Sequence, residues 1–377
     1  MKKSCKYFGI IVMMMIIGFS FAACNMGGDD NDDFDASNIL IGIAMPETDV
    51  DRWIKDGERL KALAEGKGYR AEVALGNSNQ GTQNEQIRDF LSQGAKLIVV
   101  ANINEDIVPV IAEAKAQGVI IISYDRLITG SGDYDFYVTF DNLKVGQLMG
   151  ESIADELALE NATTANPKNI ALFAGSTADN NAKFFFDGAM DILNPYIEDD
   201  VLKVIGPSPQ SSGDSEFADI SIENWDPINA KPMMQSLLVN EAANVTLDAV
   251  LAPNDTNARA IIEACKEDTQ NRYDEELPLV TGQDAELASI QLIKDGEQYM
   301  TVFKDIRELA KKTIDLADML LRGQTSGNIA GTRKDTSTYN TGVKMVTSYL
   351  LEPVSVNQDN YEEILIDNGY INADDLN

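Results

Sequence analysis

The sequence predicts an α/β fold in which two doubly wound parallel-sheet lobes follow one another. Three observations lead to this prediction. Short apolar runs alternate with amphipathic helical patterns, as in parallel strands that are joined by helices. This alternation restarts near Asn169. The folded part, about 340 residues from Ile39 onward, also exceeds the usual size of a single hydrophobic core.

The first half of the folded part carries four predicted strands. These strands lie at 39–44, 72–75, 96–100 and 119–123, and helices are predicted between them at 53–64, 85–91 and 107–116. The strand at 39–44 is apolar on both faces, as in a sheet that helices cover on both sides. Gly94 and Gly118 directly follow predicted helices, where a residue in the left-handed conformation commonly ends the helix.

The second half repeats the pattern with longer connections. Its strands are predicted at 169–174, 202–205, 249–252, 278–281 and 299–303, with helical stretches between them. We find no phosphate-binding glycine loop after any of these strands, and no Gly-x-Gly-x-x-Gly after the first strand of the chain. The sequence therefore gives no support to a nucleotide enzyme.

The N-terminus has the features of an export signal. Lys2, Lys3 and Lys6 precede 17 uncharged residues at 7–23, which end in Ala22 and Ala23 before Cys24. The boundary resembles a bacterial lipobox, although Phe21 stands where such boxes usually carry Leu. We expect 1–23 to be a lipoprotein signal peptide, Cys24 to be acylated, and 24–37 to be a flexible acidic tether. An uncleaved membrane anchor and a plain cleaved signal are the alternatives.

Composition excludes several classes of function. The chain has 30 basic and 61 acidic residues and a net charge of −31, so we expect no nucleic-acid partner. It has no histidine, which removes Ser-His-Asp and Cys-His catalysis and the commonest zinc ligand. Once the leader has gone and Cys24 is acylated, Cys265 is the one remaining thiol, and it lies in an apolar helical pattern that predicts burial. We expect neither a cofactor nor a metal.

Polar residues follow almost every predicted strand. In doubly wound sheets, ligands bind beyond the carboxyl ends of the strands. The candidates at these ends are Arg52, Asp125, Arg126, Asn181, Asn254, Asp255, Asp284 and Lys304, and Trp225 lies in a loop. Asp or Asn after a strand is more often a turn or helix cap than a ligand contact, so only the coincidence of these residues in both halves indicates a binding site.

This set of residue types suits a sugar. Carboxylate and amide oxygens accept hydrogen bonds from hydroxyl groups, and Arg and Lys donate charge-assisted bonds to hydroxyl and ring oxygens. An aromatic ring such as that of Trp225 covers the apolar C–H face of a sugar ring. We therefore expect a binding protein rather than an enzyme.

Long segments of the chain resemble the periplasmic sugar-binding proteins of the type I binding-protein fold. The resemblance covers essentially the whole mature chain. It is nearest to the ChvE-type multiple-monosaccharide-binding proteins and more distant to the D-xylose-binding proteins. The segments that carry it are IGIAMPETDVDRWIKDG, GVIIISYDRLITGSGD, FYVTFDNLKVGQL, DNNAKFFFDGAM, NWDP, TGQDAE, GEQYMTVFKDIRELAK and GVKMVTSYLLEPVSV.

The resemblance implies a role for each candidate residue. Arg52, Asp125 and Arg126 would bind sugar hydroxyls from the N-terminal lobe. Asn181, Asn254 and Asp284 would bind them from the C-terminal lobe, with Asp255 as the substitute for Asn254. Lys304 would lie at the hinge side, and Trp225 would stack on the ring. The implied ligand is an aldopyranose of the glucose, galactose or xylose type.

The resemblance also implies a hinge that the chain crosses three times. We expect the crossings near Phe140 and Asp141, near Lys304 and Asp305, and around 339–343. The N-terminal lobe would then comprise 38–141 and 305–338, and the C-terminal lobe 142–304 and 339–377. Because the sugar would contact both lobes only when they are closed, binding would favour the closed state.

The implied partners are the permease and ATPase subunits of an ABC importer. The chain itself would be a monomer, anchored by lipid on the periplasmic or cell-surface side. A sugar-sensing receptor that feeds chemotaxis or a two-component kinase is the alternative. A glycoside hydrolase would need two carboxylates at a set separation, and the abundance of acids leaves that possibility open. A LacI-like repressor would need a helix-turn-helix and a basic face, and this N-terminus offers a signal instead.

Overall fold

The computed structural model describes residues 34–48 and 51–376. The predicted signal peptide, Cys24 and most of the predicted tether lie outside these residues. The compact unit begins at Asp35, whose carboxylate caps a short 3-10 turn at Ala36–Asn38. Among the helices within the described ranges, none combines the length and the apolar character that a membrane crossing requires.

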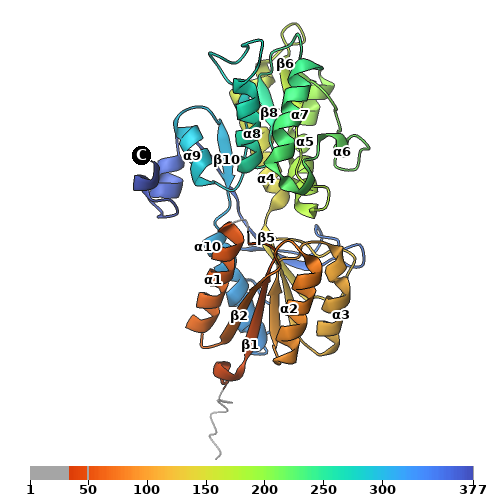
Figure 1. Ribbon diagram of the computed structural model, residues 1–377, viewed down its shortest axis with the longest axis vertical. Helices are drawn as coiled ribbons and strands as arrows, with labels where there is room; N and C mark the ends of the chain where they lie inside the picture. The colour runs from red at the N-terminus through yellow and green to blue at the C-terminus, as the bar shows by residue number, and fades with distance from the viewer. Residues whose placement is uncertain (1–33, 49–50, 377) are drawn as a thin grey trace, which may run out of the picture. The chain divides into compact units, whose positions relative to one another are not determined.

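Seven strands form the sheet of the N-terminal lobe (Figure 1). They pair in the order β11-β12-β5-β4-β3-β1-β2, and only the β11–β12 pair is antiparallel. The strands are β1 (Leu40–Met45), β2 (Arg70–Leu75), β3 (Leu97–Val100), β4 (Ile120–Tyr124), β5 (Phe136–Phe140), β11 (Arg333–Asp335) and β12 (Thr347–Leu351). Residues of β1 and β3 are buried throughout, as expected for a sheet with both faces covered.

Helices cover both faces of this sheet. Side chains of alternate β1 and β3 residues pack with α2 (Gln80–Ser92) and α3 (Val108–Ala116). On the other face, α1 (Asp51–Gly66) packs against α10 (Ile306–Leu321). Gly94 and Gly118, just past α2 and α3, have φ values of 81° and 74°, which confirms their predicted role in ending these helices.

The C-terminal lobe has a parallel four-stranded sheet in the order β7-β6-β8-β9. Its strands are β6 (Lys168–Leu172), β7 (Leu202–Val204), β8 (Ala249–Leu251) and β9 (Leu279–Val280). One face packs on α4 (Asn142–Glu156) and α5 (Asn180–Glu198), and the other on α7 (Pro227–Val239) and α8 (Asp255–Lys266). The short α6 (Phe217–Ile220) lies in the β7–α7 connection. The predicted fold class, two doubly wound lobes, is confirmed.

A second, two-stranded sheet accompanies the C-terminal lobe. It pairs β10 (Met300–Phe303) with β13 (Val354–Asn357) in antiparallel fashion. The segment after β13 packs apolar side chains against α9 (Leu287–Lys294) and β10. This arrangement brings the C-terminal segment beside the end of β10.

The chain passes between the two lobes three times, but the third crossing differs from the prediction. The first crossing lies between β5 and α4 and the second between β10 and α10, near the predicted positions. The third lies between Leu351 and Val354 rather than at 339–343, because β12 pairs in parallel with β5 in the first sheet. Residues 340–345 instead form a turn on the N-terminal lobe, where the Gly130 amide donates to the Thr341 carbonyl over 2.7 Å.

Candidate functional site

The predicted site residues lie at the carboxyl ends of strands in both lobes. Arg52 lies in the first turn of α1, which follows β1, and Asp125 and Arg126 directly follow β4. In the C-terminal lobe the candidates follow β6, β7, β8, β9 and β10 in turn. Strand topology therefore brings them to the edges where doubly wound sheets hold their ligands.

An ion pair between Arg52 and Asp125 forms the centre of the part of the candidate site that lies on the N-terminal lobe. Arg52 Nη2 lies 2.9 Å from Asp125 Oδ1. Burial raises the pKa of Asp125, but Arg52, Lys304 and Arg126 outweigh this effect and hold the pKa below its usual value. Asp125 therefore stays ionised at neutral pH and can accept hydrogen bonds from hydroxyl groups.

The backbone of Asp125 is fixed in an uncommon conformation. Its φ is 62°, in the left-handed region. Three donors hold its carbonyl oxygen: the Tyr137 hydroxyl at 2.7 Å, the Thr139 hydroxyl at 3.2 Å and Asn181 Nδ2 at 3.0 Å. Surroundings that over-determine a strained residue are typical of functional sites.

The Arg126 guanidinium joins several segments. It donates to the Asn102 carbonyl over 3.2 Å and to Glu47 Oε1 over 3.4 Å. Its Nε lies 3.9 Å from Asp179 Oδ2, at the start of α5. Both guanidinium groups lie over the Trp53 ring, that of Arg52 at 4.5 Å and that of Arg126 at 5.0 Å from the ring centre. These cation–π contacts fix the direction of both guanidinium groups.

Asn181 connects the two lobes through its amide group. Its Nδ2 donates to the Asp125 carbonyl, and its Oδ1 accepts from Asn142 Nδ2 over 2.9 Å. The Tyr137 hydroxyl lies 3.1 Å from the same Oδ1. The side chain is buried and is engaged with protein groups, so it ties the loop of Asp125 to α5.

Asp284 and Lys304 form the matching ion pair of the C-terminal lobe. Lys304 Nζ lies 2.9 Å from Asp284 Oδ1, and Lys304 is buried. Asp284 has a φ of 98°. Burial lowers the pKa of the Arg52 guanidinium, but Asp125, Asp56 and, to a smaller extent, Asp284 outweigh this effect and raise it. The two pairs therefore act on each other across the lobes, and the structure brings Arg52, Asp125, Asp284 and Lys304 together.

Trp225 rests on the C-terminal lobe in a strained loop. Its φ is 60°, and its ring lies on Gly175, where an added Cβ would come within 2.1 Å of Trp225 Cη2. Its edge faces Phe185, with the ring centres 6.3 Å apart, and Lys304 Nζ lies 5.3 Å from the centre of the Phe185 ring. Trp225 and Lys304 thus share one aromatic neighbour.

Asn254 and Asp255 have structural contacts instead. Asn254 caps α8, since its Oδ1 accepts from the Asn257 amide over 3.2 Å. Asp255 is fully buried, and its carboxylate accepts from the Glu286 amide and from Gln298 Nε2, both over 2.9 Å. Burial, and next the nearby Glu286, raises the pKa of Asp255 well above its usual value.

Sequence reasoning missed three residues that shape the site. Trp53 and Asp56 lie on α1, where helical spacing indicates core packing and gives no sign of contact with arginine. Asp179 looks like a cap, and it does cap α5 through the Asn181 amide, but it also faces Arg126. The position of Asp179 just before a helix was a signal in the sequence, because it indicated a cap. No local sequence pattern marks Trp53 or Asp56 as part of the site.

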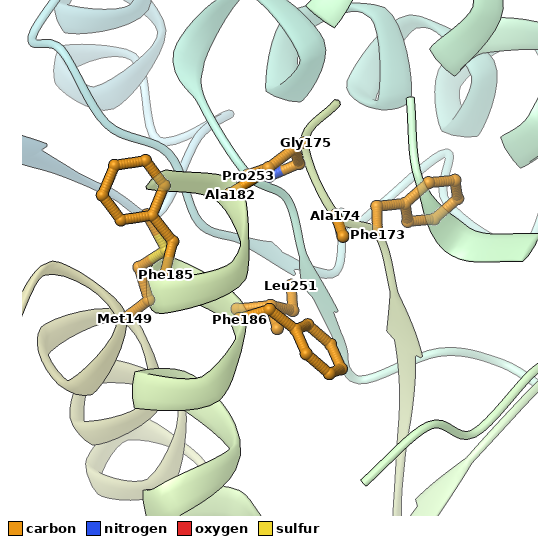
Figure 2. A pocket seen from close by; sticks show the side chains of 9 residues that line it. All are labelled: Met149, Phe173, Ala174, Gly175, Ala182, Phe185, Phe186, Leu251 and Pro253. Carbon is orange, nitrogen blue, oxygen red and sulfur yellow. The ribbon is translucent and has the colours of Figure 1, made fainter. Parts of the chain in front are cut away.

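Two hollows lie outside the set of predicted residues. Figure 2 shows the first, an apolar cavity of about 10 Å³ inside the C-terminal lobe, which has room for about one water molecule. Phe185, Phe186, Leu251 and Gly175 are among the residues that line it, and the Trp225 ring lies against Gly175. The second is an open polar groove of about 570 Å³ at the amino ends of β6 and β7, lined by Lys168, Lys203 and their neighbours.

Within residues 34–48 and 51–376, no group of His, Cys, Asp and Glu is arranged to hold a metal ion. Cys265 is buried, and burial raises the pKa of its thiol to about 12. The thiol is therefore neutral at ordinary pH and is a poor nucleophile.

Comparison with known proteins gives consistent matches. The family described as "Periplasmic binding protein domain" matches residues 41–325. The multiple sugar-binding periplasmic receptor ChvE of Rhizobium radiobacter is 40% identical over 91% of this chain and 94% of its own length. The D-xylose-binding periplasmic protein of Escherichia coli is 34% identical over 90% of this chain and 93% of its own.

A solved structure extends this similarity to three dimensions. An ABC transporter solute-binding protein from Clostridium phytofermentans, solved with bound β-D-glucose, superposes with a TM-score of 0.80. It is 37% identical, and the match covers 90% of this chain and all of that chain.

Proposed function

This chain belongs to the periplasmic binding protein domain family, and from that premise we propose that it captures an aldopyranose between two closing lobes and delivers it to an ABC permease. The family resemblance expected from the sequence is confirmed, including its ChvE-type and D-xylose-binding members. Both relatives are named as sugar-binding proteins, one of them as a receptor, and neither is named as an enzyme.

The convergence of two ion pairs from opposite lobes is the observation that carries the proposal. Arg52–Asp125 and Lys304–Asp284 each pair a donor with an acceptor, and their charges influence each other. A sugar hydroxyl is donor and acceptor at once, so it can bridge such a pair without leaving either charge unsatisfied. Arg126 adds further donors to this set.

Trp225 would cover the apolar face of the sugar ring. Its indole is held by Gly175 beneath it and Phe185 at its edge, so little motion is left to lose on binding. Asn181 would bind sugar only after giving up a protein contact, because its amide already joins Asp125 and Asn142. Asn254 and Asp255, which cap and anchor loops here, would support the site rather than touch the ligand.

Closure of the lobes would be the working step. The sugar would gain contacts from both lobes only in the closed state, and it would shift the population toward that state in proportion to the difference in affinity. The three crossings would act as the hinge, and the permease would recognise the closed surface. No covalent bond would be made or broken.

The location of the protein follows from the same proposal. The relatives include periplasmic proteins, and the N-terminal sequence predicts export and acylation at Cys24. The chain would act as a lipid-anchored monomer beside the permease and ATPase subunits. A Cys24→Ser variant should be released from the membrane fraction, and retention of that variant in the membrane would contradict the anchor.

Titration calorimetry of the exported chain with D-glucose, D-galactose, D-xylose and myo-inositol tests the sugar proposal. We expect micromolar or tighter binding of at least one aldose. An absence of binding with every common aldose would overturn the proposal.

A sensory role is the second candidate, because the Rhizobium relative is called a receptor. Deleting the cognate permease separates the two roles. Sugar uptake should fail if the chain serves transport, whereas intact uptake with a lost sugar response would favour sensing.

A further inference from the structure

Asp56 is a buried acid behind the site that the proposed function leaves without a role. It lies on α1 one turn after Arg52 and is fully buried. Arg52 Nε lies 3.4 Å from its Oδ2, and Arg59 Nη1 lies 3.9 Å from its Oδ1. Neither carboxylate oxygen has a hydrogen bond of normal geometry within the described ranges, although the Tyr124 hydroxyl is close enough to lower the pKa of Asp56. Retaining a buried charge with such loose contacts costs stability, which suggests a functional reason for the acid.

The Arg52 guanidinium is held by two carboxylates, those of Asp125 and Asp56. Its Nη2 faces Asp125 at 2.9 Å, its Nε faces Asp56, and Trp53 lies 4.5 Å from the guanidinium carbon. Both of these nitrogens are buried, whereas the side chain as a whole keeps 21% of its surface exposed. The two carboxylates therefore orient the guanidinium while part of the side chain remains accessible.

We propose that Asp56 is a positioning residue, whose carboxylate holds Arg52 in its sugar-binding orientation and whose protonation in mildly acidic medium loosens Arg52 and weakens sugar capture. This inference rests on the proposed function, because it assumes that Arg52 binds the sugar. Asp56 itself does not touch the ligand.

The groups around Asp56 determine where it takes up a proton. Arg52 and Arg59 on α1, Tyr124 on β4 and Asp125 after β4 influence its pKa, and its own charge has a minor effect on the pKa of Tyr370 in the C-terminal segment. Burial, together with the nearby Asp125, raises the pKa of Asp56 to about 6, against the lowering effects of Arg52, the Tyr124 hydroxyl and Arg59. The pKa of Asp125 is lowered, so Asp125 stays charged while Asp56 changes state.

The expected pH dependence follows from this difference. If the sugar binds only the chain in which Asp56 is ionised, the sugar affinity is highest when the pH is well above the pKa of Asp56. The affinity then falls as the pH drops below that pKa. A pKa of about 6 gives roughly tenfold weaker binding at pH 5 than at pH 7.5.

The effect of Asp56 on stability has the opposite sign. Its pKa is higher in the folded chain than the ordinary value of 3.8, so the folded state holds the proton more tightly than the unfolded state. Stability from this group is therefore lost as the pH rises from about 4 to about 6. Asp56→Asn, which is neutral at every pH, should melt at a higher temperature than the native chain at pH 7.5. If Asp56 had a merely structural role, Asp56→Asn would lower both the stability of the chain and its affinity for the sugar.

The test measures aldose affinity by calorimetry from pH 5 to pH 7.5 for the native chain, Asp56→Asn and Glu58→Gln. Glu58 is exposed on the same helix, so Glu58→Gln removes one negative charge from α1 without changing the surroundings of Arg52. We expect about a tenfold fall toward pH 5 for the native chain and for Glu58→Gln. Asp56→Asn should bind at least about tenfold more weakly at pH 7.5 and show no further fall toward pH 5.

A second variant changes the pKa of Asp56 and keeps the Asp56 carboxylate itself. Tyr124→Phe removes the hydroxyl that lowers the pKa of Asp56, so the midpoint of the pH profile should move to higher pH. Equal falls toward pH 5 in the native chain and Asp56→Asn would overturn the inference, as would a native affinity that is constant over this range. If the native chain binds no aldose at any pH, the proposed function fails and this inference fails with it.

Discussion

In the N-terminal lobe, the candidate residues are held mainly by ion pairs, whereas in the C-terminal lobe they are held by a mixture of one ion pair, side-chain and backbone hydrogen bonds, and aromatic packing. Arg52 and Arg126 lie against Trp53 and contact four carboxylates: Asp125, Asp56, Glu47 and Asp179. In the C-terminal lobe, the Asp284–Lys304 pair is the ion pair formed between two candidate residues within the described ranges.

This difference suggests that the two lobes contribute to sugar binding in different ways. Charged partners that already face each other need little rearrangement to accept a hydroxyl group, so the N-terminal lobe is suited to bind the sugar first. In the C-terminal lobe, Asp255 and Asn254 shape the loops, and Trp225 offers a surface. Variants should therefore behave differently in the two lobes, and the four experiments below test that difference in order of expected effect.

Asp125→Ala should have the largest effect on sugar affinity. The change leaves Arg52 without its nearest carboxylate in a buried setting, and we expect a loss of about 3 kcal/mol, or more than a hundredfold. Calorimetry at pH 7.5 measures the loss. Asp125→Asn should lose nearly as much, because the charge rather than the shape carries the contact. Asp133→Ala, an exposed change in the same loop, is the control. An unchanged affinity in Asp125→Ala would show that the site is misplaced.

Gly175→Ala tests the aromatic surface of the C-terminal lobe without touching a polar group. An added Cβ would come within 2.1–2.4 Å of three ring atoms of Trp225, so the indole must move. Overpacking of this kind costs about 1–3 kcal/mol, and we expect sugar affinity to fall by a similar amount.

The control for this change is Gly213→Ala, where the nearest atom would lie at 3.5 Å. Calorimetry and tryptophan fluorescence of both variants report affinity and the position of the ring. A displaced ring with unchanged affinity would remove Trp225 from the site.

Asp255 should behave as an anchor whose shape matters more than its charge. Asp255→Ala removes the acceptors for the Glu286 amide and Gln298, and we expect a loss of about 2 kcal/mol in the free energy of unfolding. Denaturant titration measures this loss.

The pH dependence separates charge from shape at this position. Because burial raises the pKa of Asp255, its ionisation opposes folding, and native stability should fall as the pH rises above 3.8. Asp255→Asn should keep most of the stability and flatten that dependence. If Asp255→Asn unfolds as readily as Asp255→Ala at pH 7, then the carboxylate charge matters here as well.

The strand pattern predicted most of this architecture because both sheets are built from local apolar runs. The four strands at 40–45, 70–75, 97–100 and 120–124 were all visible in that way. β12 was not visible in this way. Because β12 belongs to the first sheet, the third crossing lies later in the chain than predicted. Its residues pair with β5, more than 200 positions earlier, and a local pattern cannot identify so distant a partner.

The sequence indicated which residues gather at the strand ends, but not how their side chains are oriented. Polar residues at strand ends indicated Arg52, Asp125, Asp284 and Lys304, and the structure brings these together. The sequence could not tell which way a side chain turns at a helix start. At 254–255, one residue caps the helix and the next turns into the protein, although both are equally plausible ligands.

Asn254→Ala should have the smallest effect of the four and should reveal whether that residue is only a cap. Loss of an N-cap costs about 1 kcal/mol of stability, and we expect sugar affinity to change by less than about twofold. Asn79→Ala is the matched control, because Asn79 caps α2 in the same way through the Thr82 amide and is not among the site residues. The two variants should therefore lose similar stability in denaturant titration and keep similar affinity in calorimetry. If Asn254→Ala alone loses tenfold in affinity at equal stability, Asn254 binds the ligand directly, and the C-terminal lobe has a larger share in recognition than its contacts in this structure indicate.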